Sequence, residues 1–144
     1  MKNLLAGLIA TLALSANAYA ATIVVGTDAG FAPYEFKDPK TNEIVGFDID
    51  LIKATIEATG NEAKIQNMQF AGLIPALQTN MIDVAASGMT ITPERLKQIA
   101  FSDPYYEIGG LVMVVQDKKK GQYSVYEDLE NKRVCAQIGS TGAI

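Results

Sequence analysis

The stretch from residue 81 to 106, MIDVAASGMTITPERLKQIAFSDPYY, constrains the fold of this chain more than any other. A short apolar run at 84–86 predicts the end of a buried strand, and Ser87-Gly88 interrupts it. Thr92 is a favourable helix N-cap, and Pro93 suits the first helical position because its missing N–H would be unpaired there anyway. The pattern therefore predicts a strand, a glycine-containing turn and a helix start in direct succession.

This junction also has the chemistry of an anion site. A strand that stops at Gly88 and leads into a helix start leaves backbone N–H groups without partners, and such groups attract anions. Arg95 lies one turn into the helix, where its planar guanidinium can bind a carboxylate through two N–H groups. With the Thr90 hydroxyl, these donors suit the α-carboxylate of a small ligand. The alternative is a solvated Arg95 and an ordinary turn residue at Thr90, because such caps are common.

The composition excludes several classes of function. The 144 residues are 49% hydrophobic, which is enough for one domain with a buried core. No histidine is present, and Cys135 is the single cysteine. Ser-His-Asp and Cys-His catalysis, zinc sites of His or several Cys, and an internal disulfide are therefore excluded. We predict no metal and no cofactor, and we interpret Cys135 as a buried small apolar residue.

The charge pattern argues against a nucleic-acid partner. The net charge is −4, and its carriers are scattered along the chain. The one basic run, Lys118-Lys119-Lys120, has no interleaved aromatic residues and is typical of a solvated loop.

Residues 1–20 have the pattern of a secretory signal peptide. Lys2 is followed by an apolar stretch at 4–14, and the segment ends in Ala18-Tyr19-Ala20, an A-x-A cleavage site. The alternative, a transmembrane anchor, is disfavoured because polar residues at 15 and 17 interrupt a stretch already shorter than the ~20 residues of a span. We therefore predict export, most simply to a Gram-negative periplasm.

The region after the leader alternates between strand and helix patterns, which predicts an α/β fold with a mostly parallel sheet. Asp48 is expected to cap the first long helix, and capping with the helix dipole accounts for both Asp48 and Asp50. The predicted strands are 22–26, 63–69, 82–86, 111–115 and 132–138, the helices are 48–59 and 73–79, a hairpin joins 34–37 to 43–47, and a helical turn covers 125–129.

Three candidate binding residues follow the predicted strands directly. Asp28 and Phe31 come after the first strand, and Phe70 comes after the second. In an open α/β sheet, ligands bind beyond the carboxyl ends of the strands, so these side chains lie where a ligand would be. The alternatives are a turn-forming role for Asp28 and ordinary core positions for Phe31 and Phe70.

Four phrases together resemble the periplasmic polar amino-acid-binding proteins, the solute receptors of ABC importers of the glutamine- and lysine/arginine/ornithine-binding type. They are GFDIDL from 46, GLIPALQT from 72, ASGMTITPER from 86 and FSDPYY from 101. The resemblance implies a periplasmic-binding-protein-like fold of type II, with two lobes joined by a hinge. It divides the chain into an incomplete lobe 1 at 21–104, a hinge at 105–109 and the truncated start of lobe 2 at 110–144.

The resemblance also implies the roles of individual residues. Arg95, with Gly88 and Thr90, would hold the α-carboxylate of an L-amino acid. Phe31 and Phe70 would enclose the methylenes of its side chain, and Asp28 would bind the distal nitrogen. Gln137 and Thr141 would reach the ligand from lobe 2, from the strand and loop that end in Gly139-Ser140-Thr141-Gly142.

These roles imply a monomeric receptor that binds a free amino acid and delivers it to an inner-membrane ABC permease complex. The sequence leaves open whether the ligand is of the glutamine or the arginine/lysine type. An enzyme on the same fold, similar to the cyclohexadienyl dehydratases, is an alternative in which Asp28 would carry the acid–base chemistry. A ligand-sensing fragment without a transport role is a third possibility.

Overall fold

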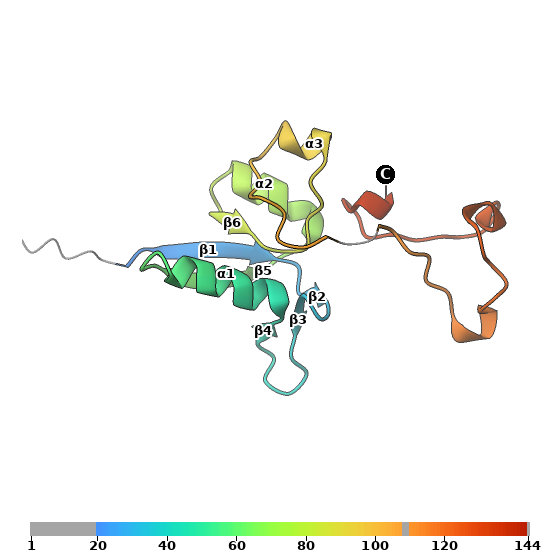
Figure 1. Cartoon of the computed structure of the whole chain (residues 1–144), viewed down its shortest axis with the longest axis horizontal. Helices are drawn as coiled ribbons and strands as arrows, with labels where there is room; N and C mark the ends of the chain where they lie inside the picture. Colours follow the sequence, from blue (N-terminus) through green and yellow to red (C-terminus); the bar gives the residue numbers. More distant parts are fainter. Residues whose placement is uncertain (1–19, 108–109, 144) are drawn as a thin grey trace, which may run out of the picture.

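A computed structural model describes residues 20–107 and 110–143 (Figure 1). The predicted signal peptide lies outside the described residues except for residue 20, and so do residues 108–109 of the predicted hinge.

A parallel sheet forms the centre of the fold. Strand β1 (Thr22–Thr27) pairs with β5 (Glu62–Asn67) over its whole length and with β6 (Val84–Ala85) at its end. The order β5-β1-β6 places the first strand of the chain in the middle of the sheet. These three strands confirm the strands predicted at 22–26, 63–69 and 82–86, with bounds that differ by up to two residues.

A second, antiparallel sheet lies beyond the end of β1. Its order is β2-β3-β4, formed by β2 (Gly30–Phe31), β3 (Glu35–Lys37) and β4 (Ile44–Val45). Strands β3 and β4 are the predicted hairpin around the polar turn at 38–42.

Helices cover both faces of the parallel sheet (Figure 1). Helix α1 (Phe47–Glu57) packs on one face, and α2 (Leu73–Gln78), which follows the short 3-10 turn η1 (Phe70–Gly72), packs on the other. A short helix, α3 (Pro93–Leu96), begins at the predicted cap, because the Thr92 hydroxyl accepts a hydrogen bond from the Arg95 N–H at 3.3 Å.

The core follows from the alternation of side chains along β1. Val25 is fully buried and packs with Ile56 of α1, whereas its neighbour Val24 packs on the opposite face with Leu73 and Ile82. Successive side chains of a strand point to opposite faces, so one strand serves two apolar layers. Each fully buried aliphatic side chain contributes about 1.5–3 kcal/mol to this core.

The prediction that Asp48 caps α1 is wrong. The N-cap is Gly46, and Asp48 lies in the first turn of the helix with only 2% of its surface exposed. Gly46 has φ +127°, and a Cβ there would overlap the backbone carbonyl of Tyr34. The chain therefore needs a glycine where the antiparallel sheet turns into α1, and Asp48 is free to bind other segments.

We expect Gly46→Ala to lower the free energy of unfolding by about 2 kcal/mol, because it combines a disfavoured φ with a backbone clash. Urea denaturation would measure the change. Gly72→Ala is the matched control, since a Cβ at residue 72 meets no atom within 4 Å. Equal stabilities of the two variants would contradict the structural role of Gly46.

Residues 110–143 contain short 3-10 turns only, within the part of the chain that the structure describes. The helical turn predicted at 125–129 is confirmed as η3 (Tyr126–Leu129), which accompanies η2 (Asp117–Lys119) and η4 (Thr141–Ala143). The strands predicted at 111–115 and 132–138 are wrong. Their apolar side chains are exposed, since Val114 is 87% and Ile138 is 79% exposed.

The predicted burial of Cys135 is also wrong, because this residue is exposed. Figure 1 shows the reason for these differences: most of the segment extends away from the two sheets, and it pairs with neither of them. Without a neighbouring strand or a covering helix, an apolar run has neither hydrogen-bond partners nor a surface on which to pack.

Candidate ligand-binding site

A cavity of about 480 Å³ lies at the carboxyl ends of the parallel strands. Asp28 directly follows β1, Phe70 lies three residues after β5, and Ser87-Gly88 follow β6. All eight residues that the sequence analysis selected line this cavity: Asp28, Phe31, Phe70, Gly88, Thr90, Arg95, Gln137 and Thr141. The remaining lining residues are Gly30, Glu35, Ser87, Gly110, Leu111, Ser140 and Gly142.

Arg95 is a buried cation in the wall of the cavity. Only 6% of the residue is exposed, and the guanidinium carbon lies 5.5 Å from the centre of the Phe70 ring. Its two terminal nitrogens donate hydrogen bonds to the backbone carbonyls of Thr90, at 2.6 Å, and Gly139, at 2.8 Å. Burial lowers the pKa of Arg95, but arginine remains charged in proteins. Carbonyl oxygens are neutral, so these bonds orient the guanidinium without cancelling its charge.

Asp28 joins three segments at the cavity. One of its carboxylate oxygens, Oδ2, accepts hydrogen bonds from the Phe70 N–H at 2.8 Å and from the Gln137 side-chain amide at 2.9 Å. Its own N–H donates to the Ser87 hydroxyl at 3.0 Å. The Gln137 contact and the Arg95–Gly139 contact place residues 137–139 against the strand ends, although no strand leads to them.

Glu35 is a second carboxylate in the cavity, and the sequence analysis missed it. The residue is 1% exposed, its Oε1 accepts a hydrogen bond from the Ser87 hydroxyl at 3.0 Å, and its Oε2 has no partner among the described residues. Burial raises the pKa of Glu35 to about 7, the charges of Asp48 and Asp28 add to the rise, and the Ser87 hydrogen bond opposes it. An unpaired buried carboxylate is costly unless a ligand supplies a partner.

Glu35 reaches the cavity through a strand pairing that the sequence analysis did not predict. It stands directly opposite Phe31 in the β2–β3 pair. Phe31 itself is half exposed and stacks on Tyr34, with ring centroids 5.2 Å apart and an interplanar angle of 23°.

Gly88 does not offer the free N–H donor that the sequence analysis assigned to it. Its N–H donates to a carboxylate oxygen of Asp48 at 2.8 Å. Gly88 also has φ +52°, in the left-handed region that glycine adopts at low cost. In this structure its contribution to the cavity wall is therefore its backbone conformation and the absence of a side chain.

Residues 23–134 match the family of bacterial extracellular solute-binding proteins, family 3. The match covers more than half of the chain. The chain belongs to this family. The periplasmic-binding-protein-like α/β fold that the resemblance implied is thereby confirmed. The family consists of solute-binding proteins, and none of the relatives described below is an enzyme, so the dehydratase-like alternative has no support.

Similar proteins are named for arginine. The chain is 41% identical over 140 residues to arginine-binding protein 1 of an ABC transporter from Escherichia coli K12, covering 97% of this chain and 55% of that protein. The arginine-bound form of a truncated arginine-binding protein from T. maritima is 50% identical with a TM-score of 0.81, covering 85% of this chain and 57% of that one. An arginine-bound form of domain 1 of the T. maritima protein is 53% identical with a TM-score of 0.60. The match covers 62% of this chain and 71% of that one.

The chain spans about half the length of the curated relatives that it matches. Among the described residues, no group of three or more His, Cys, Asp or Glu side chains is arranged to hold a metal ion. None of the helices in the described part of the chain has the length and apolar character of a membrane span.

Proposed function

We propose that this chain belongs to a receptor that binds a cationic L-amino acid of the arginine type and delivers it to an ABC importer. One observation carries the proposal: a buried guanidinium and two carboxylates line the same cavity of about 480 Å³. An amino acid with a basic side chain has the complementary charges, one carboxylate and two cationic groups. The volume lies within the range of about 300–1,000 Å³ that is usual for small-molecule sites.

The assignment of charges to ligand groups follows from the contacts. Arg95 is the group for the α-carboxylate, because its fork is oriented by the Thr90 and Gly139 carbonyls and keeps its charge. Glu35, with its unpartnered Oε2, is the group for the cationic side chain, and Asp28 adds a second negative charge. Phe31 and Phe70 offer aromatic surface for the methylenes, while Gln137 and Thr141 contribute from the segment after residue 110.

The names of the relatives described above support arginine. The E. coli relative is called an arginine-binding protein, and the T. maritima structures are arginine-bound. The side chain of glutamine carries no positive charge that could pair with Glu35, whereas the side chains of arginine and lysine do. We therefore prefer the cationic side chain to the glutamine type that the sequence analysis left open.

The proposal extends to the organisation and location of the chain. Residues 1–20 are a signal peptide, 21–104 the first lobe, 105–109 the hinge and 110–144 the beginning of the second lobe. The receptor is a periplasmic monomer, and its transport partner is an inner-membrane permease complex. The family description as extracellular solute-binding proteins supports export. Ligand contacts with both lobes would shift the population toward the closed form, through a hinge motion at 105–109.

A thermal-shift panel on the purified chain tests the binding activity. L-arginine at a hundred times its dissociation constant is expected to stabilise the chain by about 2.7 kcal/mol, which is an easily measured rise in melting temperature. Two analogues serve as matched ligands: agmatine lacks the α-carboxylate, and citrulline carries a neutral ureido group in place of the guanidinium. Both are expected to give smaller shifts than arginine. No shift with any L-amino acid would overturn the proposal for this chain.

A further inference from the structure

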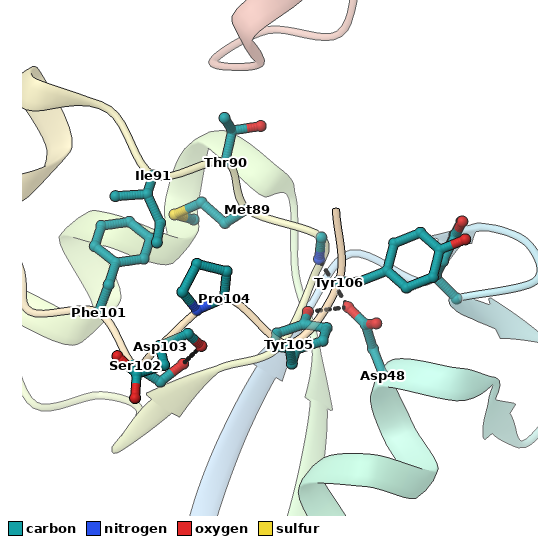
Figure 2. A pocket seen from close by; sticks show the side chains of 12 residues that line it. Asp48, Met89, Thr90, Ile91, Phe101, Ser102, Asp103, Pro104, Tyr105 and Tyr106 are labelled. Atoms are coloured by element: carbon teal, nitrogen blue, oxygen red, sulfur yellow. Dashed lines mark hydrogen bonds between the residues drawn. The ribbon is translucent and has the colours of Figure 1, made fainter. Parts of the chain in front are cut away.

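Asp48 connects the wall of the cavity to the segment that leaves the first lobe. It lies in the first turn of α1, next to the fully buried Ile49, so its backbone is fixed by the core. Its Oδ2 accepts two hydrogen bonds, from the Gly88 N–H at 2.8 Å and from the Tyr105 hydroxyl at 2.7 Å. Figure 2 shows Asp48 beside Tyr105, with the hydrogen bonds to the Asp48 carboxylate drawn as dashed lines.

The loop that carries Gly88 has open space behind it. A second cavity of about 310 Å³ lies on its other side, and Gly88 and Thr90 line both cavities. Figure 2 looks into this second cavity, between the loop and residues 101–106. On this side the loop borders open space, and its Met89 side chain packs against the core cluster of Leu73, Ala76 and Ile82. The bond from the Gly88 N–H to Asp48 is a specific contact that holds it in place.

The two hydrogen bonds that Asp48 accepts are expected to be stronger than ordinary ones. The acceptor is a carboxylate with 2% exposure, and hydrogen bonds to a charged acceptor are roughly twice as strong as neutral ones. Burial and the bond to Asp48 raise the pKa of Tyr105, so its hydroxyl stays a donor throughout the physiological range. The other oxygen, Oδ1, is buried without a partner among the described residues, so Oδ2 makes both connections.

We propose that Asp48 is a positioning residue that fastens the loop at Gly88–Thr90 to Tyr105, and thereby couples ligand binding to the orientation of the chain beyond residue 105. The proposal rests on the proposed function in one respect, namely that the first cavity binds an amino acid. A ligand that contacts the loop then acts on the predicted hinge through one carboxylate oxygen. Because coupling between two sites is reciprocal, a change in the orientation of the chain beyond residue 105 also changes the affinity for the ligand.

The first test measures arginine affinity by calorimetry in variants of the full chain. Tyr105→Phe is expected to weaken binding at least about fivefold, as typical couplings between sites do, and Asp48→Ala at least as much. Asp48→Asn keeps a side-chain oxygen that can accept both bonds, so it should bind arginine more tightly than Asp48→Ala. Tyr106→Phe removes a hydroxyl from the next residue, which makes no hydrogen bond to Asp48 in the described structure, and is the matched control. Wild-type affinity in Tyr105→Phe would overturn the coupling.

A second test remains decisive if the chain binds no amino acid. The melting-temperature losses of Asp48→Ala and Tyr105→Phe should not add, because both remove the same bond, so the double variant should melt close to Asp48→Ala. Hydrogen exchange of the Gly88 amide should be faster in Asp48→Ala than in Asp48→Asn. Additive losses, or equal exchange in the two Asp48 variants, would overturn the connection itself. Absence of ligand binding with non-additive losses would overturn only the proposed function.

Discussion

Arg95→Ala is expected to weaken the binding of L-arginine by about ten- to a hundredfold, the value of a charge-assisted hydrogen-bond pair. The reason is that the buried guanidinium is oriented by two backbone carbonyls and keeps its charge for the ligand carboxylate. Binding of agmatine, which has no carboxylate, is expected to change much less. Isothermal titration of both ligands against wild type and variant measures the difference.

Arg95→Lys separates charge from geometry. Lysine keeps the positive charge but has no planar fork, so it cannot reach the Thr90 and Gly139 carbonyls and a carboxylate together. We expect its affinity for arginine to fall between wild type and Arg95→Ala. Equal losses of arginine and agmatine affinity in Arg95→Ala would show that the residue supports the cavity structurally and does not bind the carboxylate.

Glu35→Gln is expected to lower arginine affinity at pH 8 by about tenfold or more, because it removes the charge next to the ligand's cationic end. Glutamine at this position mimics the protonated acid in shape, so the cavity should stay intact. Citrulline, whose side chain is neutral, should bind wild type and variant almost equally. An unchanged ratio of arginine to citrulline affinity would assign the side-chain contact to Asp28 instead.

The pKa of Glu35 near 7 gives this prediction a pH dependence. A cationic ligand requires the ionised carboxylate, so wild-type affinity for arginine should be about tenfold weaker at pH 6 than at pH 8. Without ligand, ionisation of Glu35 destabilises the folded state, which is the opposite of its favourable effect on arginine binding. The raised pKa favours the folded state most below the ordinary value of 4.5, and this advantage is lost as the pH rises through about 7. The melting temperature of Glu35→Gln should therefore exceed that of wild type at pH 8 and approach it near pH 4.5.

The residues at the strand ends could be predicted because local rules determine where they lie. Asp28, Phe70 and Thr90 follow apolar runs that form the parallel sheet, and such a sheet brings its carboxyl ends to one edge. Thr92 and Pro93 likewise fix the start of α3 through the chemistry of a helix N-terminus. Spacing along the chain was sufficient in each case.

The pairing of Asp48 with Gly88 and Tyr105 could not be predicted, because it joins residues 40 and 57 positions apart. Near a helix start, an aspartate satisfies the rules for capping and for the helix dipole equally well, and only tertiary structure shows which partner it takes. The same reason explains the missed Glu35, which becomes a site residue only when the hairpin places it opposite Phe31.

The strands predicted after residue 110 failed for a different physical reason. Val112, Val114 and Val134 have strand propensity, but strand propensity measures the fit to a half-buried, pleated surface. The described structure offers these residues no such surface. Gln137 and Gly139 nevertheless contact Asp28 and Arg95, because these contacts are single hydrogen bonds and require no sheet.

The central position of β1 also determines when this domain can fold during synthesis. Thr22 pairs with Glu62, and Val25 pairs with Val84, so the middle strand is made first and its last partner about 60 residues later. At a typical 5–20 residues per second, a ribosome needs roughly 3–12 seconds to cover that interval. The parallel sheet cannot close during that time, and its long-range pairings also fold slowly. A newly made chain therefore passes through a period without its core, in which export machinery or a chaperone can engage it.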